Sequence, residues 1–188
     1  MITSTKDIGH TIPLLLSVRS GGPIYVPGMA ETVLSLGLND NLCEVMAKLS
    51  RNPHWAYDNY RCFIQMFGVS VLHIPKQRYL DVIQAAMMKS CVSDETYLTT
   101  VDIQLIVKEF QTFTPIPENP WDQLAMAISA FFQSWNSPEA RQYRDVHGIS
   151  QDLGTGIIVQ SMVYGKRASS KMLLASLLNM TSIHSQGR

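Results

Sequence analysis

The middle of this chain carries a long helical periodicity, and strand-like segments stand before and after it. From Asp40, a residue suited to capping a helix, to about Val146, apolar side chains recur every three or four positions. Asn119 and Pro120 supply a further start signal, a cap followed by proline at the first helical position. The periodicity predicts a helical subdomain over residues 41–150. Its clearest apolar stripes are Ala56, Tyr60, Phe63 and Phe67; Tyr79, Val82, Ile83 and Met87; Ile103, Ile106, Val107 and Phe110; and Leu124, Ile128, Phe131 and Trp135.

Residues 1–40 carry strand signals on both sides of a loop rich in glycine and proline. The apolar run Leu14–Val18 is too short for a helix and is bounded by turn residues. In ETVLSLGLN, residues 31–39, leucines alternate with other residues, as they do on the two sides of an extended chain. This part of the chain is therefore predicted to form a strand, a glycine-rich loop and a second strand.

Strand character returns after the helices. GTGIIVQSMVYG, residues 154–165, is β-branched and aromatic between glycines, so a strand is predicted within residues 151–165. Residues 166–188 form a divergent tail that begins with cationic residues and ends in a polar stretch. Together these segments predict an α+β fold, in which a mostly helical insertion is flanked by the strands of a small mixed sheet.

Composition limits the kind of protein this is. With 188 residues, 46% of them hydrophobic, the chain can bury a substantial core. Fifteen basic residues balance fifteen acidic ones, so neither nucleic acid nor an anionic membrane is expected as a partner. Cys43, Cys62 and Cys91 form no C-x-x-C pair, which favours buried thiols in a reducing compartment over disulfides or a metal site. Because no apolar run approaches about 20 residues and no secretory signal is evident, a cytoplasmic protein is expected.

The loop between the first two predicted strands suggests a ligand. Arg19 stands beside it, and Gly21, Gly22 and Gly28 follow with two prolines among them. Glycines let backbone N–H groups approach a ligand closely, and a fixed cation suits a polyphosphate, so nucleotide binding is the first hypothesis. Two plainer interpretations stay open: Arg19 pairs with a carboxylate such as Glu31, or the glycines only form turns.

Several longer motifs occur in a characteristic order: SVRSG followed by PGM, then ETVLSLGLND, AYDNYRCFIQMFG, PENPWDQLAMAISAFFQSW and finally GTGIIVQSMVYG. Long motifs that agree in order are far more specific than a single glycine loop. From about Gly9 to Gly165 the chain resembles the N-terminal nucleotide-binding region of the pyruvate, phosphate dikinase family. That region is similar to the ATP-grasp fold, with a helical insertion between its strands.

The resemblance implies a function and a set of site residues. Dikinases of this family interconvert ATP, phosphate and pyruvate with AMP, diphosphate and phosphoenolpyruvate through a phosphohistidine, and they use Mg²⁺. By the resemblance, Arg19 contacts nucleotide phosphate and Gly28 lies in the matching glycine loop. Gln160, Met162 and Val163 match the strand beside the adenine of ATP or AMP, although a plain core strand has the same composition.

Departures from the family pattern limit this expectation. The chain lacks the family's phosphate-binding lysine, the acidic residues that bind Mg²⁺, and the histidine and pyruvate-binding domains, on which the rate of phosphoryl transfer depends. Met29, Ala30 and Glu31 stand where the family has Met-Met-Asp, and the resemblance ends abruptly after residue 165. We therefore expect a truncated nucleotide-binding domain with weak affinity for ATP or AMP and no catalysis alone.

Two other hypotheses remain. In one, the chain is a fragment of a split dikinase, completed by separately encoded fragments that carry the missing groups. In the other, it is a non-enzymatic helical interaction module. Strands without neighbours would also leave sheet edges open, which favours a homo-oligomer.

Overall fold

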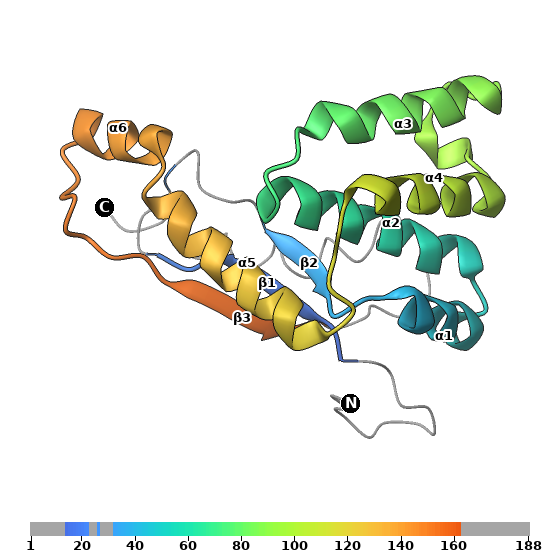
Figure 1. The fold of residues 1–188 in the computed structure, drawn as a ribbon, viewed down its shortest axis with the longest axis horizontal. Coiled ribbons are helices and arrows are strands. Elements are labelled where there is room, and N and C mark those ends of the chain that lie inside the picture. Colours follow the sequence, from blue (N-terminus) through green and yellow to red (C-terminus); the bar gives the residue numbers. More distant parts are fainter. Residues whose placement is uncertain (1–13, 23–25, 27–31, 163–188) are drawn as a thin grey trace, which may run out of the picture.

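The computed structural model describes residues 14–22, 26 and 32–162, and within them it contains a small sheet and a set of helices (Figure 1). The α+β class that the sequence predicts is confirmed. The predicted divisions at residues 1–40, 41–150 and 151–165 stay predictions, and the predicted tail lies outside the described residues. In chain order the elements are β1 (Leu16–Ser20), β2 (Val33–Leu36), α1 (Asp40–Ser50), α2 (Pro53–Ser70), α3 (Lys76–Lys89), the 3₁₀ turn η1 (Glu95–Tyr97), α4 (Thr100–Phe113), α5 (Pro120–Trp135), α6 (Pro138–Val146) and β3 (Ile157–Ser161).

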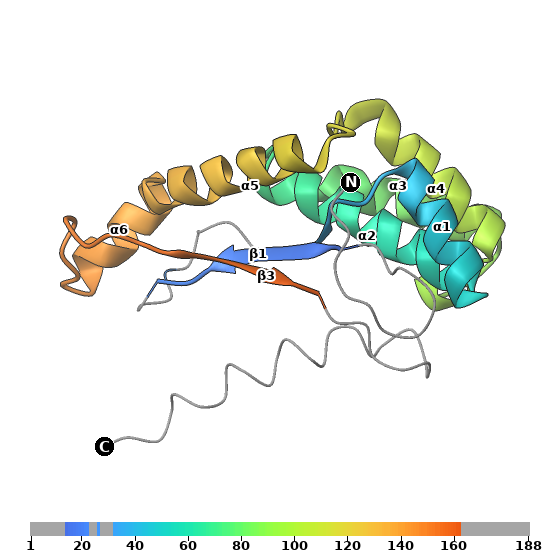
Figure 2. The same cartoon turned by 90° about the horizontal axis from the view of Figure 1, so that it is seen from below.

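The described strands form one sheet in the order β2-β1-β3. Both pairings of β1 are antiparallel, where the sequence predicts a mixed sheet. The ladder between β1 and β3 runs from Leu16 opposite Ser161 to Ser20 opposite Ile157. β2 and β3 both begin beside the C-terminal end of β1 and run toward its N-terminal end. Both strands are therefore antiparallel to β1. Figure 2 shows the helices gathered on one side of β1 and β3.

β2 is shorter than the strand predicted from residues 31–39, and it does not keep a simple alternation. Ser35 has φ 59° and Gly37 has φ 108°, and the pairing with β1 shifts in register. Val33, Ser35 and Leu36 are all buried as a result. A left-handed residue inside a strand is the kind of bulge that re-aims side chains, and a two-residue repeat does not predict it.

The helix starts follow the sequence signals, with one correction. α1 begins at Asp40, but its cap is Asn39, whose side-chain oxygen accepts a hydrogen bond from the Leu42 N–H at 2.9 Å. Asp40 lies instead in the first turn, where the helix dipole favours a carboxylate. α5 starts as predicted, with Asn119 as its cap and Pro120 at the start of the helix.

One large core joins the sheet to the helices. Buried residues of β1, β2 and α1 to α5 form a contiguous cluster. The apolar stripes of α2 and α4 are buried along their whole length, because α2 contacts α1, α3, α4, α5 and β2 and α4 packs against both α2 and α3. The predicted helical stretch therefore shares its core with the strands instead of enclosing a separate one.

Close packing in this core depends on a glycine in α2. A side-chain carbon added to Gly68 would overlap the hydroxyl oxygen of Tyr79. That hydroxyl lies 2.8 Å from the Thr114 Oγ1, and the Tyr79 ring meets Phe110 edge-on with ring centres 4.8 Å apart. Gly68 thus makes room for a buried tyrosine whose polar atom is paired.

Gln123 of α5 ties this helix to the end of β2. Its side chain is fully buried, accepts a hydrogen bond from the Gly37 N–H at 2.8 Å, and donates to the carbonyl oxygens of Leu38 at 3.1 Å and Pro117 at 2.8 Å. The buried amide is satisfied by these bonds. They hold the start of α5 against the sheet, over which the helix runs in Figure 1.

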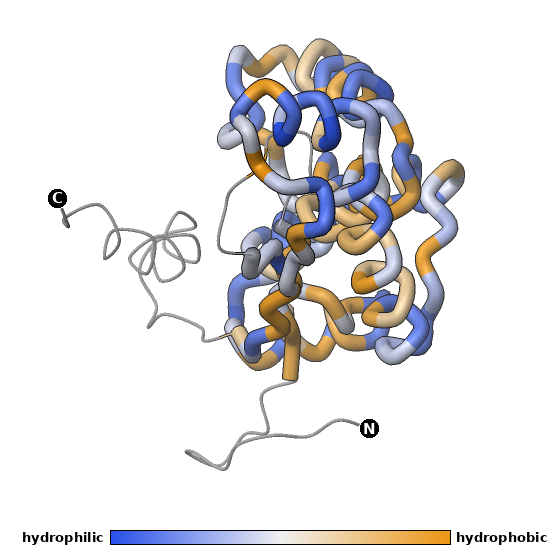
Figure 3. Tube along the Cα trace, turned by 90° about the vertical axis from the view of Figure 1, so that its left-hand side faces the viewer, coloured by the Kyte–Doolittle hydropathy of each residue, from blue (hydrophilic) through white to orange (hydrophobic). Residues whose placement is uncertain are grey.

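Hydrophobic and hydrophilic stretches alternate along the described helices in Figure 3, as they do in amphipathic helices that pack on a core. None of the described helices combines the length and the apolar character needed to cross a membrane.

Candidate functional site

Arg19 lies near the C-terminal end of β1, opposite Ile158 of β3. The residue is partly buried, and its Nε is buried with no hydrogen-bond partner among the described residues. A buried donor without an acceptor costs on the order of 1 to 3 kcal/mol. An anionic oxygen placed at Nε would remove that cost.

The register of the ladder places three of the predicted site residues on one face of the sheet. In an antiparallel pair, residues directly opposite each other point to the same face, and the face alternates along each strand. Arg19 is opposite Ile158, and Gln160 follows two residues later in β3. Met162 continues the ladder, because its N–H donates to the Leu15 carbonyl oxygen at 2.9 Å. We name the face that carries Arg19, Ile158, Gln160 and Met162 the Arg19 face.

Two glycines extend the ladder beyond Arg19. The Gly21 N–H donates to the Gly156 carbonyl oxygen at 2.8 Å. A Cβ on Gly21 would lie 2.5 Å from Cγ1 of Ile158, and a Cβ on Gly156 would lie 3.4 Å from the Gly21 oxygen. At Gly21 the missing side chain therefore has a structural use, since Ile158 packs across it.

Gln160 and Met162 have different surroundings. Gln160 is exposed, and its carbonyl oxygen accepts a hydrogen bond from the Ser17 Oγ at 3.3 Å. Met162 is partly buried against the main core, and its Sδ lies 2.9 Å from the Ser35 nitrogen. The structure thus leaves the Gln160 side chain open to solvent and ties Met162 to the core beside β2.

The other two predicted site residues, Gly28 and Val163, lie outside the described residues. Glu31, the alternative partner of Arg19, lies outside them as well. The roles of Gly28 and Val163 and the pairing of Arg19 with Glu31 therefore stay predictions.

Thr155 is a polar residue close to this site that the sequence patterns did not single out. It precedes Gly156, and its Oγ1 is buried without a hydrogen-bond partner among the described residues. Within the described part of the chain, the Arg19 Nε and the Thr155 Oγ1 are the buried side-chain atoms left unpaired. Both belong to segments that meet at Gly21, and only the three-dimensional environment distinguishes this threonine from others.

The described residues of the Arg19 face do not fit a Mg²⁺ site. Mg²⁺ is usually held by carboxylate oxygens, and Arg19, Ile158, Gln160 and Met162 supply none. No group of three or more His, Cys, Asp or Glu side chains in residues 14–22, 26 and 32–162 could hold a metal ion.

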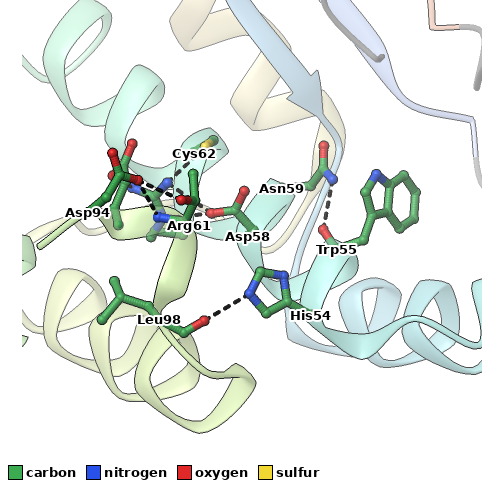
Figure 4. A network of polar contacts seen from close by, with 10 residues as sticks. His54, Trp55, Asp58, Asn59, Arg61, Cys62, Asp94 and Leu98 are labelled. Atoms are coloured by element: carbon green, nitrogen blue, oxygen red, sulfur yellow. Dashed lines mark hydrogen bonds and ion pairs between the residues drawn. The ribbon is translucent and has the colours of Figure 1, made fainter. Parts of the chain in front are cut away.

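A second arginine, Arg61 of α2, lies in a different environment (Figure 4). Its side chain is 9% exposed and pairs with Asp58 at 2.8 Å and with Glu95 at 3.5 Å. Burial raises the pKa of the neighbouring Cys62 thiol to about 11, although the Arg61 charge opposes that rise. The network joins α2 to the segment before α4, so Arg61 has a structural role.

A cavity of about 200 Å³ lies between α1, α2, α4 and residues 114–118. Among its lining groups, the Gln111 Nε2 donates to the Asp40 Oδ1 at 2.8 Å and to the Tyr60 hydroxyl at 3.2 Å. Burial and the Asp40 carboxylate raise the pKa of Tyr60. Because these polar groups satisfy one another, the Arg19 face is the better candidate for a ligand site.

Comparison with known proteins connects this fold to one family. The model of the pyruvate phosphate dikinase AMP/ATP-binding domain matches residues 3–176. Pyruvate, phosphate dikinase of Clostridium symbiosum is 40% identical over 173 residues, which cover 88% of this chain and 20% of that protein. Pyruvate, phosphate dikinase 2 of Zea mays is 38% identical over 164 residues, covering 84% of this chain and 18% of the relative. Pyruvate, phosphate dikinase of Giardia intestinalis is 36% identical over 162 residues, with coverages of 83% and 18%.

The chain spans about a fifth of the length of these relatives, and 20% of the length of the first. The motifs from SVRSG to GTGIIVQSMVYG all fall within the matched region, as do the described elements from β1 to β3. This chain belongs to the pyruvate phosphate dikinase family, as a member of its AMP/ATP-binding domain.

Proposed function

We propose that this chain binds an adenine nucleotide, ATP or AMP, at the Arg19 face, with weak affinity and without phosphoryl transfer by itself. The observation that carries the proposal is the buried Nε of Arg19, for which no described residue supplies an acceptor, in a member of an AMP/ATP-binding domain family. In this proposal Arg19 donates to a phosphate oxygen, and Gln160 and Met162 lie beside the base. Gly28 and Val163 are proposed as further contacts.

The number of charged contacts sets the expected affinity. The described Arg19 face offers one cation, whereas phosphoryl transfer relies on several cations and a positioned acceptor. Binding in the millimolar range, about −4 kcal/mol, is therefore expected, with no turnover. The free cysteines support a reducing, cytoplasmic setting for this activity.

The test is a titration of the chain with ATP and with AMP, in the presence and absence of Mg²⁺. Binding is detected by NMR or calorimetry. Arg19→Ala is expected to weaken binding about tenfold or more, because a charge-assisted hydrogen bond is lost. Arg141→Ala, which removes an exposed arginine of α6, is the matched control and should leave the affinity unchanged. Nucleotide binding at this face is refuted if saturating ATP moves no signal, or if Arg19→Ala binds as the unaltered chain does.

A second candidate is that the chain acts as one fragment of a dikinase, together with separately encoded fragments. The observation in its favour is the outer edge of β3, beyond which no described strand pairs. Ile158 and Val159 are 37% and 42% exposed there, and β3 has no charged residue that would discourage strand pairing. A strand of a partner fragment would cover this edge, and a second copy of the chain is the competing occupant.

Co-purification with fragments that carry the other domains of a dikinase, and recovery of AMP-forming activity, would support this candidate. Val159→Lys places a charge on the open edge and is expected to abolish the association. Sedimentation of the chain alone distinguishes a partner fragment from a second copy at this edge, because self-association depends on the concentration of the chain itself. If the chain is a monomer and binds no such fragment, neither a fragment nor a second copy covers the β3 edge.

A further inference from the structure

A small second core lies where α5 meets α6, at one end of the molecule in Figure 1. It consists of Val26, Trp135 and Ala140, with Tyr143 and Leu153 packed against it. Val26 is fully buried there, although it belongs to the glycine- and proline-rich stretch between β1 and β2. A hydrophobic contact therefore holds Val26 against Trp135 and Ala140, which follow it by more than a hundred residues in the sequence.

Arg144 of α6 braces this corner. It is 1% exposed, its Cζ lies 4.2 Å from the centre of the Trp135 ring, and its Nη1 donates to the Trp135 carbonyl oxygen at 2.7 Å. Its Nε and Nη2 both donate to the Gln151 Oε1, at 3.0 and 2.7 Å. Gln151 in turn donates to the Asp145 carboxylate. The negative charge that balances the Arg144 guanidinium is therefore linked to it through the Gln151 side chain. One guanidinium thus fixes both the tryptophan and the turn after α6.

The same turn leads back to the Arg19 face. The Ile149 N–H donates to the Arg144 carbonyl oxygen at 2.9 Å, and Leu153 then packs on the small core. Three residues later Gly156 accepts the hydrogen bond from Gly21. Gly21 is therefore held by β3, and Val26 is held by the α5–α6 corner.

We propose that Val26 and the Arg144-braced Trp135 corner are positioning residues for nucleotide binding. They set where Gly21, Gly22 and Val26 lie relative to Arg19, and they do so without contacting the nucleotide. The functional consequence rests on the proposed function, whereas the anchoring of Val26 does not.

The first test measures the anchor itself by hydrogen exchange of the Gly21, Gly22 and Val26 amides. Val26→Ala removes the two methyl groups, Val26→Thr keeps the shape but adds a hydroxyl, and Arg144→Lys keeps the charge but loses the planar fork. Each is expected to speed exchange about tenfold, because local opening becomes easier. Val107→Ala is the matched control, a buried valine of α4 outside the small core. Unchanged exchange in Val26→Ala, or equal acceleration in Val107→Ala, overturns the anchor.

The second test measures ATP affinity for the same variants at a temperature where circular dichroism shows all of them folded. Val26→Ala and Arg144→Lys should weaken binding by about threefold to tenfold, with Val107→Ala unchanged. If exchange quickens but the affinity does not change, the positioning role is overturned. If the unaltered chain binds no nucleotide, the proposed function and its positioning both fail, and the exchange result still decides the anchor. Should Arg144→Lys not fold, the two Val26 variants carry both tests.

Discussion

Two arginines show how differently the helical region and the sheet treat a buried cation. Arg61, among the helices, pairs with Asp58 and Glu95. Arg19, on the sheet, has a buried Nε for which no described residue supplies an acceptor. A cation with its own carboxylates stabilises a fold, whereas a cation with an unpaired buried donor is prepared for an anion.

The contrast extends beyond the arginines. In the helical region the buried polar groups find partners within the chain, as Tyr79 does with Thr114 and Gln123 with three backbone groups. Near the end of β1, the Arg19 Nε and the Thr155 Oγ1 are unpaired among the described residues. Packing within the chain thus satisfies the first region, and the second is where nucleotide binding is proposed.

Gly68→Ala should produce the largest effect on stability. The added carbon would displace the Tyr79 hydroxyl from its place beside Thr114, so overpacking and a lost hydrogen bond together are expected to cost about 3 kcal/mol. Denaturant unfolding measures the change. Gly154→Ala is the control near the sheet, because a Cβ there meets nothing within 4 Å, and its effect should stay within about 0.5 kcal/mol. If Gly68→Ala and Gly154→Ala lost equal amounts of stability, the distinction between a tightly packed helical region and an open end of the sheet would be wrong.

Arg61→Ala should have the second largest effect on stability, a loss of about 2 kcal/mol in the free energy of unfolding. Removing the cation leaves Asp58 and Glu95 without their partner, but both are partly exposed and solvent screens them, so the loss falls below that of a fully buried pair. Arg61→Lys should recover part of it, since the charge is kept and the planar fork is not. A neutral outcome for Arg61→Ala would mean that this network is not structural.

Arg19→Ala should change stability by less than about 1 kcal/mol, and toward greater stability, because removal of a buried donor with no described acceptor is partly offset by the lost packing of the partly buried arginine stem. The same substitution should abolish most nucleotide binding. Thermal unfolding with and without ATP separates the two effects. A large loss of stability in the absence of nucleotide would show that Arg19 has a structural partner, as Arg61 does.

The effect expected to be smallest at neutral pH, and to develop only at alkaline pH, is a pH dependence that belongs to the helical region. Burial raises the pKa of Cys43 to about 12 and that of Cys62 to about 11, from an ordinary value of 9.0. The folded chain therefore keeps protons that the unfolded chain releases, so this contribution is fully present below pH 9.0 and is lost as the pH rises through the folded-state values. Unfolding measurements across this range should show stability falling with pH. In the double variant Cys43→Ala, Cys62→Ala, the free energy of unfolding should fall less steeply with pH between 9.0 and about 12. An unchanged slope would show that these two thiols are not the cause of the pH dependence.

Local sequence signals predicted most of the helical region. The stripes of α2 and α4 follow a period of 3.6 residues, and the cap at Asn119 with Pro120 marks the start of α5. The cap of α1 was misplaced by one residue, because Asn39 and Asp40 are equally suited to that role. Ser35 escaped prediction because its left-handed backbone depends on how β2 pairs with β1.

The candidate site was predicted less completely. Arg19, Gln160 and Met162 came from motif resemblance, and the register of β1 with β3 is what relates them to one face. Thr155, Val26 and Arg144 carried no sequence signal, because their interest lies in burial and in partners distant along the chain. No spacing rule relates a valine in a glycine-rich stretch to a tryptophan more than a hundred residues later.

By itself the sequence determined the family, the helices and the presence of a strand on either side of them, since motif order, periodicity and caps are properties of neighbouring residues. The tertiary structure alone decided that the described sheet is antiparallel, that Arg61 is paired, and that the Arg19 Nε lacks a described acceptor. These depend on which segments meet in space. Hydrophobic burial brings such segments together with little regard for their separation along the chain.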